Sequence, residues 1–181
     1  RLYDDVVSEY GPLAHLVRAA GFRVFGVGLD TVVWMNTAVA IGVVVMLRAI
    51  FRTLGNKWMG WLAPMVFISV FAFENYYLVS NYNFITPYSA QATYGFAGML
   101  LLLLGLLRYV KTERPIWLLA AGVGLAVVFL DKPDLLLASL GALAVFLVAQ
   151  VIQRARSDSV RASWQWLLLA SLPLAAGFIA L

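Results

Sequence analysis

The sequence predicts an all-α fold: a polytopic transmembrane helical bundle of about six spans with an interfacial amphipathic helix. Hydrophobic residues make up 63% of the chain and charged residues only 12%, with a mean hydropathy of +0.88. Soluble domains hold about 45–50% apolar and roughly 25% charged residues. The apolar residues also fall into runs close to the about 20 residues that one span needs. Finally, basic residues follow alternate runs, as expected when a chain crosses a membrane repeatedly.

The chain is expected to form a single membrane domain, residues 1–181, in two parts. Residues 1–30 begin with an acidic run and predict the first extracytoplasmic loop with its interfacial helix, whereas residues 31–181 predict the transmembrane bundle. Pro12 suits the first turn of a helix because its missing N–H would be unpaired there. The apolar residues after it recur at helical spacing, which predicts a short amphipathic helix lying in the membrane interface. Asp30 and Thr31 are expected to cap the helix that follows.

Six apolar segments are predicted to cross the membrane. They cover about residues 31–51, 58–79, 91–109, 116–130, 135–152 and 164 onward. Pro64 predicts a kink in the second segment. The fourth is short and contains Gly122 and Gly124, small residues that let helices pack closely. Because the chain begins at Arg1 and ends inside the sixth apolar run, we expect it to be a fragment truncated at both ends.

Placing the charged residues on this topology separates them by sign. One side holds nine basic residues and two acids, which gives +7, and the other holds four basic residues and seven acids, which gives −3. The positive-inside rule predicts such an asymmetry and assigns the basic side to the cytoplasm. The total of +4 is therefore a topology signal, and we expect no nucleic-acid partner.

Three polar segments fall on the acidic side: residues 1–12, 74–88 and 131–134. Charged groups are costly at membrane depth, so they usually face a cavity or a partner. Loop carboxylates are nevertheless often simply solvated. The turn 131–134 likewise has two interpretations: a self-neutralising turn in which Lys132 pairs with a flanking aspartate, or a turn in which Lys132 binds an anion. With no cysteine and one histidine, disulfides, thiolate metal sites and most catalytic triads are excluded.

Three sequence motifs carry a resemblance to a known family. They are residues 3–13 (Tyr-Asp-Asp-Val-Val-Ser-Glu-Tyr-Gly-Pro-Leu), Asn81-Tyr82 with Pro87-Tyr88, and Gly122-Val123-Gly124-Leu125-Ala126 through Asp131-Lys132-Pro133-Asp134. In this order they resemble the loop signatures of polytopic glycosyltransferases of the GT-C class, in particular the dolichyl-phosphate-mannose mannosyltransferase-like and RgtA/B/C/D-like families. Two positions depart from the pattern: Asp131 stands where Thr is usual, and Asn36 stands where many relatives carry Arg.

The resemblance implies a membrane hexosyl- or pentosyltransferase. Such an enzyme takes a sugar from a polyprenyl-phosphate donor and passes it to a lipid, glycan or protein acceptor on the periplasmic face, here of a bacterial inner membrane. Carried over residue by residue, Asp5 matches the catalytic base, with Asp4 as the alternative, and Lys132 matches a ligand of the donor phosphate. The other expected substrate-binding residues are Glu9, Tyr10, Tyr82 and Tyr88.

The residue types suit this chemistry. An acceptor hydroxyl must lose its proton as it attacks the anomeric carbon, and a nearby carboxylate can take that proton. The departing lipid phosphate gains charge, which a lysine or a metal ion can stabilise. Asp5 and Glu9 are also suited to hold a divalent cation through their oxygens, and the sequence leaves the cofactor requirement open.

The competing class is a non-enzymatic membrane protein such as a transporter. Transporters use membrane carboxylates for ion coupling and often contain repeated halves with broken helices. The acids of this chain gather on one side and no internal repeat is found, so the sequence favours the transferase.

Overall fold

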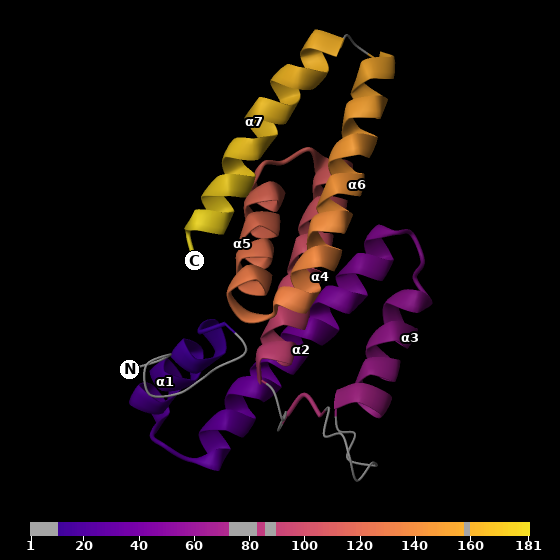
Figure 1. Ribbon diagram of the computed structural model, residues 1–181. Helices are drawn as coiled ribbons and strands as arrows, with labels where there is room; N and C mark the ends of the chain where they lie inside the picture. Colours follow the sequence, from indigo (N-terminus) through magenta and orange to yellow (C-terminus); the bar gives the residue numbers. More distant parts are fainter. Residues whose placement is uncertain (1–10, 73–82, 86–89, 158–159) are drawn as a thin grey trace.

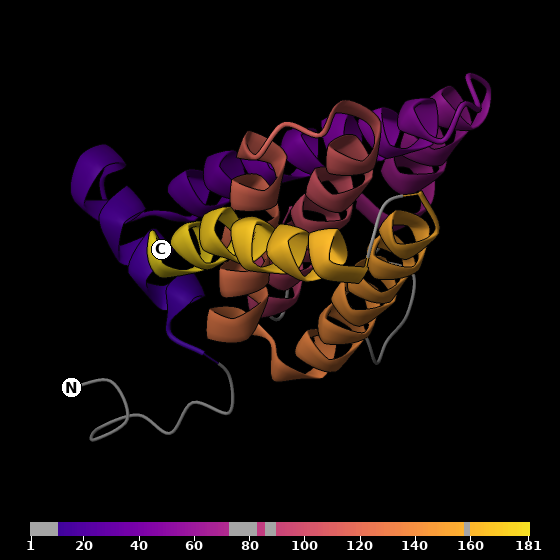
Figure 2. The same ribbon diagram turned by 90° about the horizontal axis from the view of Figure 1, so that it is seen from above.

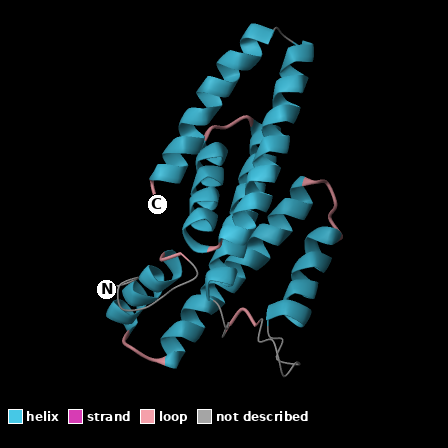
Figure 3. Cartoon of the chain, viewed as in Figure 1, coloured by secondary structure: helices cyan, strands magenta, loops and turns pink. Residues whose placement is uncertain are grey.

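The computed structural model describes residues 11–72, 83–85, 90–157 and 160–181. These residues form helices and loops with no strand among them (Figure 3), which confirms the all-α prediction. In chain order the elements are α1 (Leu13–Phe25), α2 (Leu29–Thr53), α3 (Met59–Val66), the π-helix η1 (Phe67–Ala72), α4 (Ala90–Thr112), α5 (Ile116–Asp131), α6 (Pro133–Ser157) and α7 (Val160–Ile179).

Every apolar segment predicted as a span contains a helix, but the helices differ in length. Among the described residues, α2, α4 and α6 are long and apolar enough to cross a membrane. The shorter apolar helices are Met59–Ala72, Ile116–Asp131 and Trp166–Ile179. Three candidate spans are therefore found, and the six-span topology stays a prediction.

The predicted cap of α2 is wrong in its details. The residue that precedes the helix is Gly28, and it makes no side-chain cap hydrogen bond. The Thr31 hydroxyl instead donates to the carbonyl oxygen of Gly26 at 2.8 Å. Asp30 lies within the first turn, where a carboxylate favours the positive end of the helix dipole.

Helix α4 lies at the centre of the bundle and contacts α1, α2, α5 and α6, while α7 packs on α5 and α6 (Figures 1 and 2). Two apolar clusters fill the spaces around it. One joins α4 to α5, α6 and α7 and includes Leu102 and Phe146. The other joins α4 to α2 and η1 and includes Val43 and Phe67.

Glycines allow α4, α5 and α7 to approach closely, as Gly122 and Gly124 predict. A Cβ added at Gly124 would lie 2.5 Å from the backbone nitrogen of Leu102 and 2.6 Å from the carbonyl oxygen of Gly98. One added at Gly122 would overlap the carbonyl oxygen of Leu174 in α7. Backbone atoms cannot move aside as a flexible side chain can, so only glycine permits these helix crossings.

We expect Gly124→Ala to destabilise the bundle by about 1–3 kcal/mol, the usual range for overpacking a close contact. The matched control is Gly141→Ala in α6, where nothing lies within 4 Å of the added Cβ and the higher helix propensity of Ala favours the helix. Thermal unfolding in detergent micelles measures both variants. Equal stability of the two would contradict the close crossing of α4 and α5.

Most of the described basic residues gather at one end of the bundle, whereas Arg18, Arg23 and Lys132 belong to α1 and the α5–α6 turn. The α2–α3 and α4–α5 connections, the C-terminal end of α6 and the N-terminal end of α7 lie toward this end, whereas α1 and the α5–α6 turn lie toward the other (Figure 1). Arg154 of α6 donates to Glu113 Oε1 at 2.8 Å, next to the α4–α5 connection. Arg108 lies over the ring of Trp117, 5.6 Å from its centroid. The polar end opposite them contains the candidate site.

Candidate functional site

Two segments far apart in the sequence meet at the end of the bundle opposite the basic residues. The backbone N–H of Gly11 donates to the carbonyl oxygen of Asp131 at 3.3 Å. The N–H of Ala14, 117 positions away, donates to Asp131 Oδ1 at 3.0 Å. The proximity expected between residues 1–12 and 131–134 is thus found for the part of the first segment that the structure describes.

Asp131 caps the start of α1 from another helix. The first N–H groups of a helix have no partner inside it, and a side-chain oxygen just before the helix usually accepts one of them. Pro12 occupies that position in α1 and supplies no such oxygen. The carboxylate of Asp131 accepts the hydrogen bond instead. The Asp131 side chain is 0% exposed, and in the described part of the chain its Oδ2 has no hydrogen-bond partner.

Gly11 makes the closest approach to the α5–α6 turn. A Cβ added there would overlap the carbonyl oxygen of Leu130 and would lie 2.9 Å from the backbone nitrogen of Asp131. Both obstacles are backbone atoms. The glycine of the first sequence motif is therefore required for its contact with the third.

Lys132 pairs with one of its two flanking aspartates. Its Nζ lies 3.1 Å from Asp134 Oδ2, and the side chains are 16% and 77% exposed, respectively. The ion pair expected of a self-neutralising turn therefore forms with Asp134, while Asp131 holds α1. A pair with so exposed a carboxylate contributes only about 0–1 kcal/mol.

Helix α4 supports this turn through Gly95. A Cβ added at Gly95 would lie 2.8 Å from Lys132 Cβ and 3.3 Å from Leu135 Cδ1. The stem of Lys132 thus packs on the surface of α4 where no side chain intervenes. This contact fixes the position of Lys132 Cβ relative to α4.

Two further polar contacts connect the same end of the bundle. Gln91 Nε2 at the start of α4 lies 3.1 Å from His15 Nε2 of α1. Asn36 of α2 is 1% exposed and donates through Nδ2 to the carbonyl oxygen of Ile85 at 3.0 Å. Asn36, noted in the sequence only as a departure from Arg, therefore holds residues 83–85 beside α2.

Most of the predicted site residues lie outside the described residues. They are Asp4, Asp5, Glu9, Tyr10, Tyr82 and Tyr88, and their roles stay predictions. In the part of the chain that the structure does describe, no group of three or more His, Asp or Glu side chains could hold a metal ion. The divalent cation suggested for Asp5 and Glu9 is therefore also still a prediction.

The residue that sequence reasoning missed is Asp131. The sequence presents it as a partner for Lys132 and as a departure from the family pattern, and not as a helix cap, because a cap normally lies next to the helix that it caps.

Comparison of the chain with models of protein families, with curated proteins and with solved structures finds no match.

Proposed function

We propose that this protein is a multi-pass membrane glycosyltransferase of the GT-C kind, with six spans and its active site on the periplasmic side of a bacterial inner membrane. It moves a sugar from a polyprenyl-phosphate donor to a lipid, glycan or protein acceptor. The supporting observation is the contact of Gly11 and Ala14 with Asp131, which joins the segment after Asp5 to the turn that contains Lys132.

In the proposed reaction the acceptor oxygen forms a bond to the anomeric carbon while the bond from that carbon to the phosphate oxygen breaks. The phosphate leaves with the electron pair, and the acceptor proton passes to the Asp5 carboxylate. Lys132 stabilises the charge on the leaving phosphate. Six residues of chain span at most about 20 Å, so Asp5 stays within that distance of Gly11 and of the turn beside it.

Loss of the Lys132 charge is expected to weaken donor binding. A hydrogen bond to a charged group contributes about 1.5–3 kcal/mol, so Lys132→Ala should raise the Kd of the donor about 10–100-fold. Lys132→Arg keeps the charge and should have a smaller effect. Asp134→Asn removes the competing carboxylate and should leave binding equal or tighter. Titration with a polyprenyl-phosphate sugar measures all three, and equal affinity in Lys132→Ala and the unmodified protein would favour the purely structural turn.

The activity itself is tested in proteoliposomes that contain the full-length protein and a polyprenyl-phosphate hexose or pentose labelled in the sugar. We expect label to leave the donor and to appear in an acceptor from a cell-envelope extract, with polyprenyl phosphate as the other product. A transporter would instead move solute across the vesicle membrane and leave the donor intact. That outcome would contradict the glycosyltransferase proposal and support a transporter.

A further inference from the structure

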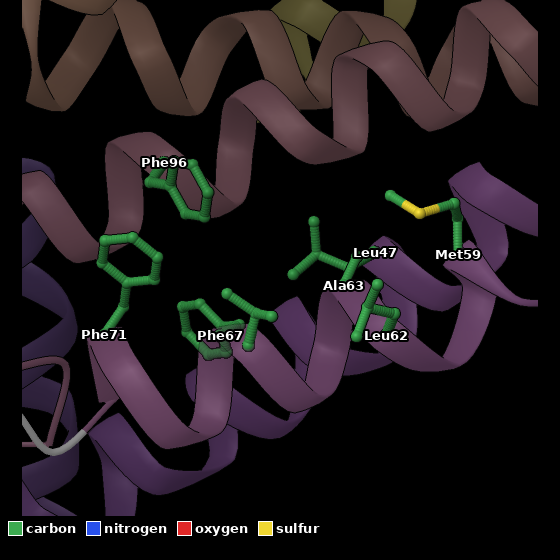
Figure 4. A pocket seen from close by; sticks show the side chains of 8 residues that line it. Leu47, Met59, Leu62, Ala63, Phe67, Phe71 and Phe96 are labelled. Atoms are coloured by element: carbon green, nitrogen blue, oxygen red, sulfur yellow. The ribbon is translucent and has the colours of Figure 1, made fainter.

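A second candidate binding site lies at a groove between α2, the α3–η1 helix and α4. All eight residues that line this groove are apolar, and it encloses a hollow of about 330 Å³ (Figure 4). Met59 lies at one end of the row of labelled side chains and Phe71 at the other (Figure 4). Leu62 and Phe71 are 52% and 50% exposed, respectively, so the groove opens toward the surroundings of the bundle.

The π-helix η1 contributes Phe67 and Phe71 to the lining of the groove. Helices of this type are rare, short and frequent at functional sites. Phe67 of η1 is 5% exposed and meets Phe84 edge to face with ring centroids 4.9 Å apart. Phe84 meets Phe96 in the same manner at 5.7 Å. Phe67 and Phe96 line the groove, and Phe84 packs against both rings.

The length of the groove matches one leaflet of a bilayer. The 12 positions from Met59 to Phe71 rise about 18 Å along a helix. Half of the hydrocarbon core of a bilayer is about 15 Å. One acyl chain of a lipid therefore fits along this surface when its headgroup lies at the Met59 end.

The chain around the Met59 end carries basic residues. Between Asp30 and Glu74 the sequence contains three basic residues, Arg48, Arg52 and Lys57, and no Asp or Glu. The Arg48 guanidinium lies over the ring of Trp61, 3.7 Å from its centroid. Arg52 and Lys57 are exposed, and the stem of Arg52 packs against Gly60. An anionic headgroup is the complement of this end.

We propose that the groove binds an anionic phospholipid, with one acyl chain along Leu62, Ala63 and Phe67 and its phosphate beside Arg52 and Lys57. The site lies on the basic side, away from the Asp131–Lys132 turn, and does not depend on the glycosyltransferase proposal. Such a lipid would fill the space that α3 and η1 leave against α4.

The test uses the full chain in nanodiscs with phosphatidylglycerol that carries a photoreactive group on one acyl chain, and with phosphatidylcholine of the same chains as comparison. Mass spectrometry locates the labelled residues. We expect labelling to concentrate on Met59–Ala72 and to favour phosphatidylglycerol. Arg52→Gln with Lys57→Gln should reduce that preference about tenfold or more, because each basic residue near an anionic surface contributes about fivefold in affinity.

Two substitutions distinguish a lipid bound in the groove from lipids that contact the whole surface of the bundle. Ala63→Trp fills the groove and should abolish its labelling, whereas Val145→Trp on α6, which is 71% exposed, should leave it unchanged. Equal labelling by both lipids, or labelling spread evenly over α6, would overturn the proposal. Because the chain contains no cysteine, ready disulfide dimerisation of Ala63→Cys would identify a second copy as the occupant and would also overturn it.

Discussion

Asp5→Asn is expected to lower turnover of the full-length protein by about 10²–10⁴-fold, the range that general-base assistance contributes. The amide keeps the shape of the side chain but cannot accept the acceptor proton. Donor binding should change little, because the proposed phosphate ligand is Lys132. Single-turnover transfer of labelled sugar, measured together with the Kd of the donor, separates the two effects.

Asp4→Asn is the matched control for this prediction and should reduce turnover less. If Asp5→Asn stayed within about threefold of the unmodified protein while Asp4→Asn were inactive, the base would be Asp4. Normal turnover in both variants would remove residues 1–10 from the catalytic machinery.

Gly11→Ala is expected to lower turnover by about 10²-fold or more, since a displacement of about 1 Å in a positioned group has effects of that size. The added Cβ would overlap the carbonyl oxygen of Leu130, so the first segment would move away from the Asp131–Lys132 turn. The apolar clusters around α4 do not include Gly11, and the helical bundle should remain folded. Circular dichroism checks the fold, and the transfer assay measures the loss.

Three further variants control for the effect of the added group and of the Asp131 side chain. Gly42→Ala in α2 places a Cβ where nothing lies within 4 Å and should retain full turnover. Asp131→Asn keeps an oxygen that can accept the hydrogen bond of Ala14, so it should be milder than Asp131→Leu. Full turnover in Gly11→Ala would show that its contact with the turn has no part in the reaction.

The sequence predicted helices well because their cause is local. Apolar runs determine where the helices form, and basic residues mark the end of the bundle to which Arg108 and Arg154 belong. Gly122 and Gly124 indicated a close crossing because small side chains are the main way in which backbones in a membrane approach each other. The kink expected at Pro64 stays a prediction, and the change from α to π at Phe67 was not predicted.

The features that the sequence did not predict depend on distant parts of the chain. The cap that Asp131 provides to Ala14 requires two helices to be placed first, and no spacing rule relates positions 117 residues apart. The pairing of Lys132 with Asp134 likewise depends on how the α5–α6 turn is folded, and the sequence alone left both flanking aspartates as candidates. The hydrogen bond from Asn36 to the carbonyl oxygen of Ile85, 49 positions away, could not be predicted for the same reason.

The measurement that tests the central claim most directly is the accessibility of single cysteines on the two ends of the bundle. Asp134→Cys reports the proposed active-site side, because the Asp134 side chain is 77% exposed and a cysteine there can react. Asn83 also belongs to this side but is only 5% exposed, so a cysteine at that position would label poorly. Lys111→Cys reports the basic side. With a membrane-impermeant maleimide on spheroplasts, we expect Asp134→Cys to react at once and Lys111→Cys only after permeabilisation. Reaction of both from the same side would contradict the proposed topology and the site built on it.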